Sequence, residues 1–272
     1  MKRLVIAVSI AAAASFGALL AGCGDKDTTG MPGESIFEIW SPPTPAEAVA
    51  WAVDPYDAEK RYRGLLLLAN APFGGEPPYV EMYRLATTDE DPGVRAMAIR
   101  ALAMHGSAPD ATYAIDGLPS EDKLVRWESA RALERFYAPE AVVPLLIRLD
   151  PEEEEDAQIR ASAARALGQY AEPRVVQGLI RSLNDRDLVV NEQARYSLRT
   201  LTGQDFVFDA RTWLNWTRGN DDLFADRGTY EYPVFHRDET FGEMLMFWTS
   251  PPNEVQGRPI GAPAPGEETR GG

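Results

Sequence analysis

The chain has 272 residues, enough for one large domain or two small ones, and 44% of them are apolar, which suffices for a buried core. Its 42 acidic and 27 basic residues give a formal net charge of −15, and because such a surface repels phosphate backbones we exclude nucleic acid as a partner. The single cysteine, Cys23, excludes an intrachain disulfide and a zinc site built from several cysteines.

The first 23 residues have the pattern of an export signal. Lys2 and Arg3 precede an apolar stretch, and small residues follow just before Cys23. The ending Leu-Ala-Gly-Cys resembles a bacterial lipobox, which implies that residues 1–22 are a signal peptide and that Cys23 carries several acyl chains. An uncleaved membrane anchor or an ordinary signal peptide is the alternative.

Residues 23–43 are rich in glycine, proline and charge, and they predict a flexible tether. Gly24, rather than an aspartate, follows the lipidation site. By resemblance to lipoprotein sorting signals, this favours the periplasmic face of the outer membrane over the inner membrane. We therefore expect an exported protein that is held at the cell envelope by lipid.

A similar phrase then recurs along the chain, as DPGVRAMAIRAL from Asp91, DKLVRWESARAL from Asp122 and DAQIRASAARAL from Asp156. The first aliphatic positions of four copies are 31, 34 and 31 residues apart, and a degenerate copy begins 34 residues earlier. These five starting positions are Lys60, Val94, Val125, Ile159 and Val190. Five copies at nearly one period indicate a stacked array.

Each copy predicts a helix with its own start signal. An aspartate lies three positions before each start, at Asp57, Asp91, Asp122, Asp156 and Asp187. Aspartate is a good N-cap because its carboxylate accepts the free N–H groups of the first turn. Apolar or small residues at the first, fifth, eighth and ninth positions form one helical face, and another apolar stretch precedes each cap. We predict an all-α fold over residues 44–202, an α-solenoid of about five stacked helical hairpins.

The pattern D-x-x-[VI]-R-x-x-[AS]-x-R-A-L resembles the HEAT repeat, in particular its short bacterial form in phycobilisome lyase subunits. The resemblance covers about residues 44–202. It implies that the second helices of the hairpins line an inner wall and that Asp–Arg pairs form a ladder between repeats. The first and last copies depart from the pattern, with Gly64 in place of alanine and Asn191 in place of arginine, which suits terminal positions.

Four arginines occupy the position after the first aliphatic residue, namely Arg61, Arg95, Arg126 and Arg160. Each lies four residues after a capping aspartate, so an ion pair within the helix is geometrically easy. We predict that these pairs hold the stack together, with about 0.3–0.5 kcal/mol from each exposed pair. The acidic run from Asp150 to Asp156 lacks the glycine of a calcium loop and predicts a solvated loop.

Positions three and seven of the second helices share one face, which holds Tyr62, Arg100, Trp127, Arg131, Arg165 and Tyr196. Arginine beside aromatic residues is typical of protein-binding surfaces, so this face is the candidate binding site. The alternative is a solvated face whose charge is neutralised by carboxylates such as Glu128 and Glu134.

Aromatic residues are dense beyond the repeats. Asp209 predicts a short helix that carries Trp213 and Trp216, and we expect residues 203–249 to seal the last apolar face of the array. An aromatic ligand groove is the alternative. Residues 250–272 are rich in proline, glycine and glutamate, and they predict disorder.

The catalytic classes tested against the sequence lack their signals. His105 and His236 are too few for a HEAT-type di-iron hydroxylase with repeated His-Glu pairs, and no Gly-x-Ser-x-Gly occurs. We expect no cofactor and no metal, and we predict a monomeric, non-catalytic scaffold that binds another protein and is anchored to a membrane through Cys23. The alternatives are a lyase-like or small-ligand-binding protein that uses the aromatic segment around His236, and a purely structural envelope protein.

Overall fold

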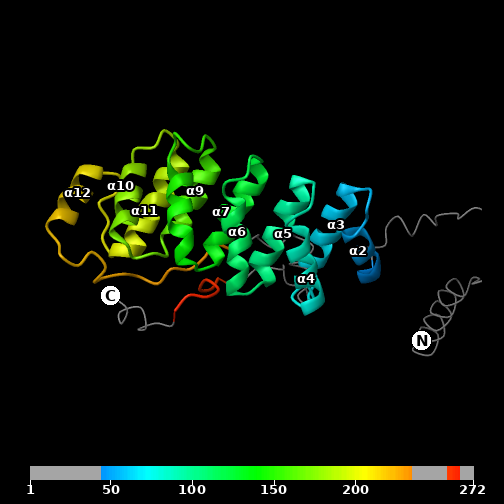
Figure 1. Cartoon of the computed structure of the whole chain (residues 1–272). Helices are drawn as coiled ribbons and strands as arrows, with labels where there is room; N and C mark the ends of the chain where they lie inside the picture. Colours follow the sequence, from blue (N-terminus) through cyan, green and yellow to red (C-terminus); the bar gives the residue numbers. More distant parts are fainter. Residues whose placement is uncertain (1–43, 235–255, 264–272) are drawn as a thin grey trace, which may run out of the picture. The chain divides into compact units, whose positions relative to one another are not determined.

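A computed structural model describes residues 44–234 and 256–263 of the chain (Figure 1). The chain divides into Met1–Pro42 and Pro43–Gly272, and the described residues belong to the second unit. Cys23, the predicted signal peptide, the whole of the predicted tether and His236 lie outside the described residues. Within the described ranges, no helix combines the length and the apolarity needed to cross a membrane.

Helical hairpins follow one another along residues 44–202. They are α2 (Pro45–Ala52) with α3 (Ala58–Ala69), α4 (Pro77–Ala86) with α5 (Pro92–His105), α6 (Ala111–Gly117) with α7 (Lys123–Arg135), α8 (Val142–Leu149) with α9 (Ala157–Leu167), and α10 (Pro173–Ser182) with α11 (Leu188–Thr202). Short 3₁₀ turns, η2 (Ala108–Asp110) and η3 (Pro139–Ala141), lead into α6 and α8. The second helices pack against one another in chain order, and each first helix covers the second helix of its own hairpin. The predicted α-solenoid is confirmed.

Each second helix begins directly after the aspartate predicted as its N-cap. The carboxylates of Asp57, Asp91, Asp122 and Asp156 accept hydrogen bonds from N–H groups of the first turn, at 2.9–3.2 Å. Asp187 occupies the same position before α11 but makes no capping hydrogen bond. Its carboxylate instead accepts hydrogen bonds from the guanidinium groups of Arg160 and Arg186, which take the place of the backbone N–H donors of α11.

Small residues let the two helices of a hairpin approach closely. Gly64 in α3 shows this most clearly, because a Cβ there would lie 2.6 Å from the carbonyl oxygen of Ala48 and would collide with the backbone nitrogen of Ala52. The glycine that departs from the repeat pattern is therefore required by the crossing of α2 over α3. The buried apolar residues form two clusters, one from α2 to α5 and one from α5 to α12, and α5 contributes to both.

The end of the array is covered by α12 (Ala210–Arg218), which packs against α10. Trp213 is fully buried there, with the ring of Phe206 edge-on at 4.8 Å. Asp209 caps α12 by accepting hydrogen bonds from the N–H groups of Arg211 and Thr212. Residues 203–218 thus close the last hairpin.

The chain then turns back along the array (Figure 1). The N–H of Gly228 donates to the carbonyl of Thr200, and an extended segment, Thr229–Val234, follows; we call it the strap. Residues 256–263 lie beside the end of α7, where Ile260 donates to the Arg135 carbonyl at 2.7 Å and accepts from the Tyr137 N–H at 2.9 Å. For residues 256–263 this differs from the predicted disorder, because backbone pairing with Phe136 at the end of α7 supplies order that composition does not reveal; the rest of 250–272 lies outside the described residues.

Candidate functional site

The ladder arginines reach across to the next repeat, in place of the predicted pairing with the capping aspartate of their own helix. The acids that receive them lie two residues before the next cap, and each guanidinium donates two hydrogen bonds of 2.6–3.1 Å to one carboxylate. The pairs are Arg61 with Asp89, Arg126 with Glu154, and Arg160 with Asp185. The physical reason is that a helical side chain points back toward the helix N-terminus, where the loop of the following repeat lies.

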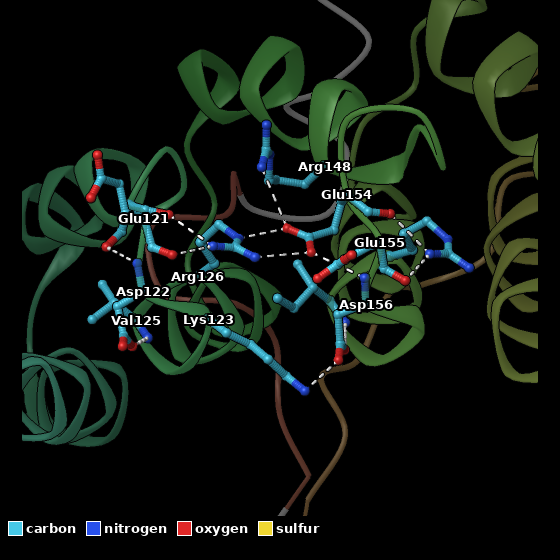
Figure 2. Close-up of polar contacts among 12 residues, drawn as sticks. Glu121, Asp122, Lys123, Val125, Arg126, Arg148, Glu154, Glu155 and Asp156 are labelled. Atoms are coloured by element: carbon cyan, nitrogen blue, oxygen red, sulfur yellow. Dashed lines mark hydrogen bonds and ion pairs between the residues drawn. The ribbon is translucent and has the colours of Figure 1, made fainter.

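Each guanidinium also ties down its own loop, as Figure 2 shows for Arg126. Its Nη1 donates to the carbonyls of Ser120 and Glu121 at 3.0 and 2.9 Å, while its other nitrogens hold Glu154. The Glu154 carboxylate in turn accepts the N–H of Asp156 at 3.1 Å. One arginine therefore joins two consecutive loops, and the acid shapes the loop that carries the next cap.

These ion pairs are buried, which corrects two expectations. The side chain of Arg160 is 0% exposed and that of Asp185 is 2% exposed, so the pair is not a surface salt bridge. Glu154 is likewise 0% exposed, although it lies in the acidic run predicted to be a solvated loop. Burial alone would raise the pKa of Glu154 and of Asp185, but the hydrogen bonds from their arginines and from the following backbone N–H lower both pKa values.

One rung of the ladder has no carboxylate. Arg95 donates to the carbonyls of Asp89 and Glu90, and Ser120 stands where the next repeat would supply its acid. These two hairpins are joined instead through their first helices. Arg84 of α4 donates hydrogen bonds of 2.7 and 3.0 Å to Asp110, which lies just before α6. The receiving acids were not among the residues predicted from sequence. Their occurrence two residues before three of the capping aspartates, Asp91, Asp156 and Asp187, is the signal that could have identified them.

Positions three and seven of α3, α5, α7, α9 and α11 form what we call the second-helix face. The structure brings its predicted residues together in pairs: the Arg131 guanidinium lies 4.8 Å above the Trp127 ring, and that of Arg165 lies 3.6 Å above the Tyr196 ring. At these distances the quadrupole of each ring attracts the guanidinium above it.

The two remaining residues of the predicted face, Arg100 and Tyr62, lie in different places. Arg100 lines a cavity of about 240 Å³ together with Arg131 and Glu128, between α5 and α7. Tyr62 lies further toward the N-terminus, beside Asp91 and Gly93. The predicted face is therefore continuous in Arg131, Trp127 and Arg100, whereas Tyr62 belongs to a separate hollow.

Two glutamates that were considered as neutralising surface charges are buried under this face. Burial raises the pKa of Glu134 to about 7, although a hydrogen bond from Ser162 and the charges of Arg165, Arg131 and Arg135 oppose the shift. Burial also raises the pKa of Glu128. Neither is a solvated counter-charge, because both are less than 10% exposed.

The strap covers part of the second-helix face. Tyr230 is 5% exposed and lies near Glu134 of α7, Arg165 of α9 and Tyr196 of α11. Its hydroxyl is buried without a hydrogen-bond partner, and burial raises its pKa well above the usual value. Nothing in the repeat pattern signals this contact, because it joins an irregular segment to three different repeats.

The described part of the chain offers no metal site. It contains no group of three or more His, Cys, Asp or Glu side chains arranged to hold an ion. His105 lies at the end of α5, where its Nε2 is 2.6 Å from the carbonyl oxygen of Ala69, and its ring stacks on Tyr83. This histidine thus links α5 to α3.

Residues 112–199 match the family model of HEAT repeats. The matched HEAT-repeat region runs from α6 to α11 and includes the Arg126 and Arg160 rungs, both stacked cation pairs and Glu134. No curated protein shows a significant match to the chain.

The chain also shows similarity to several solved structures. One is an engineered protein with 20% identity and a TM-score of 0.47, in which 64% of this chain and 85% of that chain are covered. Human deoxyhypusine hydroxylase has 24% identity and a TM-score of 0.41, covering 57% of this chain and 60% of that one. The complex of CpcE and CpcF of phycocyanin lyase from Nostoc sp. PCC7120 has 20% identity and a TM-score of 0.39, covering 65% and 82%. Similarity at this level carries no information about activity.

The ladder generates a stability prediction. Replacing Arg160 by alanine leaves Asp185 and the carbonyls of Glu154 and Glu155 buried without their donor, so the free energy of unfolding should fall by about 3–5 kcal/mol. Urea denaturation followed by circular dichroism measures the loss. Arg63→Ala is the matched control, because its pair with Glu59 is about two-thirds exposed and should contribute at most about 0.5 kcal/mol. Equal losses in the two variants would contradict a buried ladder.

Glu134 generates a pH prediction. Its pKa rises from 4.5 in the reference state to about 7 in the folded chain, so the folded state keeps a proton that the unfolded chain loses. Stability from this group is therefore complete below pH 4.5 and is lost as the pH rises through about 7, by at most about 3 kcal/mol. Glu134→Gln should remove this decline in urea titrations at pH 5 and pH 8.

The exposed residue Glu140 provides the control for this titration. Neither Glu134→Gln nor Glu140→Gln changes the groups that face position 134. These are Ser162 and Arg165 from α9, Arg131 and Arg135 from α7, and Tyr230 from the strap. Glu140→Gln should keep the wild-type decline between the two pH values. A Glu134→Gln protein with the same decline would show that another group is responsible.

Proposed function

We propose that this protein is a non-catalytic scaffold, anchored at the cell envelope through lipid on Cys23, that binds another protein on its second-helix face. The observation that supports the proposal is the pair of stacked cations, Arg131 on Trp127 and Arg165 on Tyr196, on neighbouring helices of one face. Arginine and aromatic residues are the side chains that dominate binding energy in protein interfaces.

The buried ladder supports the same proposal. Because Arg126 and Arg160 fix consecutive loops to one another, the second helices they belong to are held at a defined spacing and register. A binding surface that is already ordered loses less conformational entropy when a partner docks. The proposed mechanism is therefore presentation of a rigid surface that residues 23–43 tether to a membrane.

A second candidate is the binding of a small charged ligand. The cavity of about 240 Å³ favours it, because Arg100, Arg131 and Glu128 line it together with Pro233 and Val234 of the C-terminal segment. Native mass spectrometry of the purified protein distinguishes this candidate, which predicts a bound small molecule that is lost in Arg100→Ala. A spectrum without such an adduct would leave the scaffold as the better proposal.

The scaffold proposal is tested by crosslinking in intact cells followed by affinity purification. A protein that copurifies in stoichiometric amounts with the wild type should be lost when Trp127→Ala and Arg131→Ala are combined, while cooperative thermal melting persists. Tyr56→Ala is the control, because this residue is 95% exposed and lies outside the second-helix face. Unchanged copurification with the double variant would remove this face as the binding site.

A further inference from the structure

The strap lies on the second-helix face in the manner of a bound peptide. Its side chains alternate along an extended backbone: Tyr230, Tyr232 and Val234 turn toward the protein, whereas Glu231 and Pro233 are exposed. Alternation of this kind is how an extended segment presents every second residue to a binding surface.

Two of the inward side chains occupy recognisable subsites. The first takes Tyr230, which is buried near Glu134, Arg165 and Tyr196 from three successive second helices. The second takes Tyr232, whose ring lies 4.8 Å below the guanidinium of Arg135. These subsites are two residues apart along the strap, which matches the repeat of an extended backbone.

The strap does not satisfy the groove that it occupies. The hydroxyl of Tyr230 and the Nε of Arg165 are both buried without a hydrogen-bond partner. A buried polar atom left unpaired costs about 1–3 kcal/mol. The strap therefore places a tyrosine in this pocket without pairing either its hydroxyl or the Nε of Arg165.

Among the described residues, the strap makes few backbone hydrogen bonds. In the described structure the Tyr232 N–H donates to the Gly257 carbonyl at 3.2 Å, and no backbone hydrogen bond joins the strap to the helices. Space also remains on both sides of Pro233, in cavities of about 240 and 190 Å³. Segments with few backbone bonds and incomplete packing are those that open locally at low free energy.

The geometry points to the strap as a tethered substitute for an external ligand: the groove across α7, α9 and α11 receives an extended segment of a partner protein that presents aromatic side chains at positions i and i+2. The partner gains access by displacing the strap. This inference rests on the proposed scaffold function and assigns the chemistry of its partner.

Tethering explains why such a groove stays closed to weak ligands. A segment joined to its own binding site by a short linker acts at an effective concentration of about millimolar, so a competitor must bind well to displace it. The hydrogen bond from Gly228 to Thr200 lies directly before the strap and outside it, so displacement of the strap does not require that bond to break.

The experiment uses the full-length protein and a fluorescein-labelled synthetic peptide of residues 227–234, with fluorescence anisotropy as the readout. The wild type should bind the peptide weakly, and Tyr230→Ala should bind it at least tenfold more tightly, because the groove is vacated. The same peptide with alanine in place of its first tyrosine should not bind. Tyr230→Phe is the matched variant: it keeps the ring, removes the unpaired hydroxyl, and should bind no more tightly than the wild type.

Equal affinity of the wild type and Tyr230→Ala for the peptide would overturn the inference. If Tyr230→Ala does not fold, hydrogen exchange of the wild type decides: strap amides that exchange before those of α7 and α9 support displacement, and equal protection overturns it. A wild-type dimer that requires Tyr230 would assign the groove to a second copy of this chain and overturn a different partner. Loss of the copurifying protein in the Trp127 and Arg131 double variant alongside a negative peptide result would retain the scaffold and remove only this inference.

Discussion

The array depends on arginine side chains buried between consecutive loops. A helical hairpin has no core of its own, so each repeat must be fastened to the next, and the apolar faces alone do not fix the register of the loops. Arg160 supplies this fastening because a planar guanidinium has five donors, enough for two carbonyls of its own loop and a carboxylate of the next. Lysine, with a compact ammonium group, does not match that fork. The acid, meanwhile, organises the turn that precedes the following cap.

The ladder and the exposed face are two sides of the same helices. Arg126 and Arg160, at position two of α7 and α9, point into the loops, whereas Trp127, Arg131 and Arg165, at positions three and seven, lie on the second-helix face. Arg126 and Arg160 set the spacing of α7 and α9. Helical periodicity then places Trp127, Arg131 and Arg165 on one surface. A rigid frame thus presents ordered cation–aromatic pairs. The carboxyl groups beneath this face are buried, and the pKa of Glu134 near 7 reflects how far the helices exclude water from it.

The aromatic C-terminal segment divides between two roles. Its first part, with Trp213 against Phe206, covers the open apolar end of the last hairpin, as any stacked array requires. Its second part places Tyr230 on the surface where a binding partner is proposed to dock. The two parts differ in how their buried polar atoms are paired: Trp213 donates its indole N–H to the Val207 carbonyl, whereas the Tyr230 hydroxyl has no partner. This difference agrees with the proposal that the strap, unlike the cap formed by α12, is displaced by a partner.

The sequence by itself determined the hairpins, their period and most of their starts, because N-caps and helical periodicity are local: Asp91 and the apolar face from Val94 to Leu102 lie within one helix. Only the tertiary structure decided which acid each ladder arginine meets, since Arg160 and Asp185 are brought together by stacking and not by helical spacing. It also decided that Glu154 is buried within an acidic run and that Ser120 leaves one rung open. The position of Tyr230 was the hardest to predict from sequence. An irregular segment carries no periodic signal, and the pocket that holds Tyr230 exists only where three repeats adjoin.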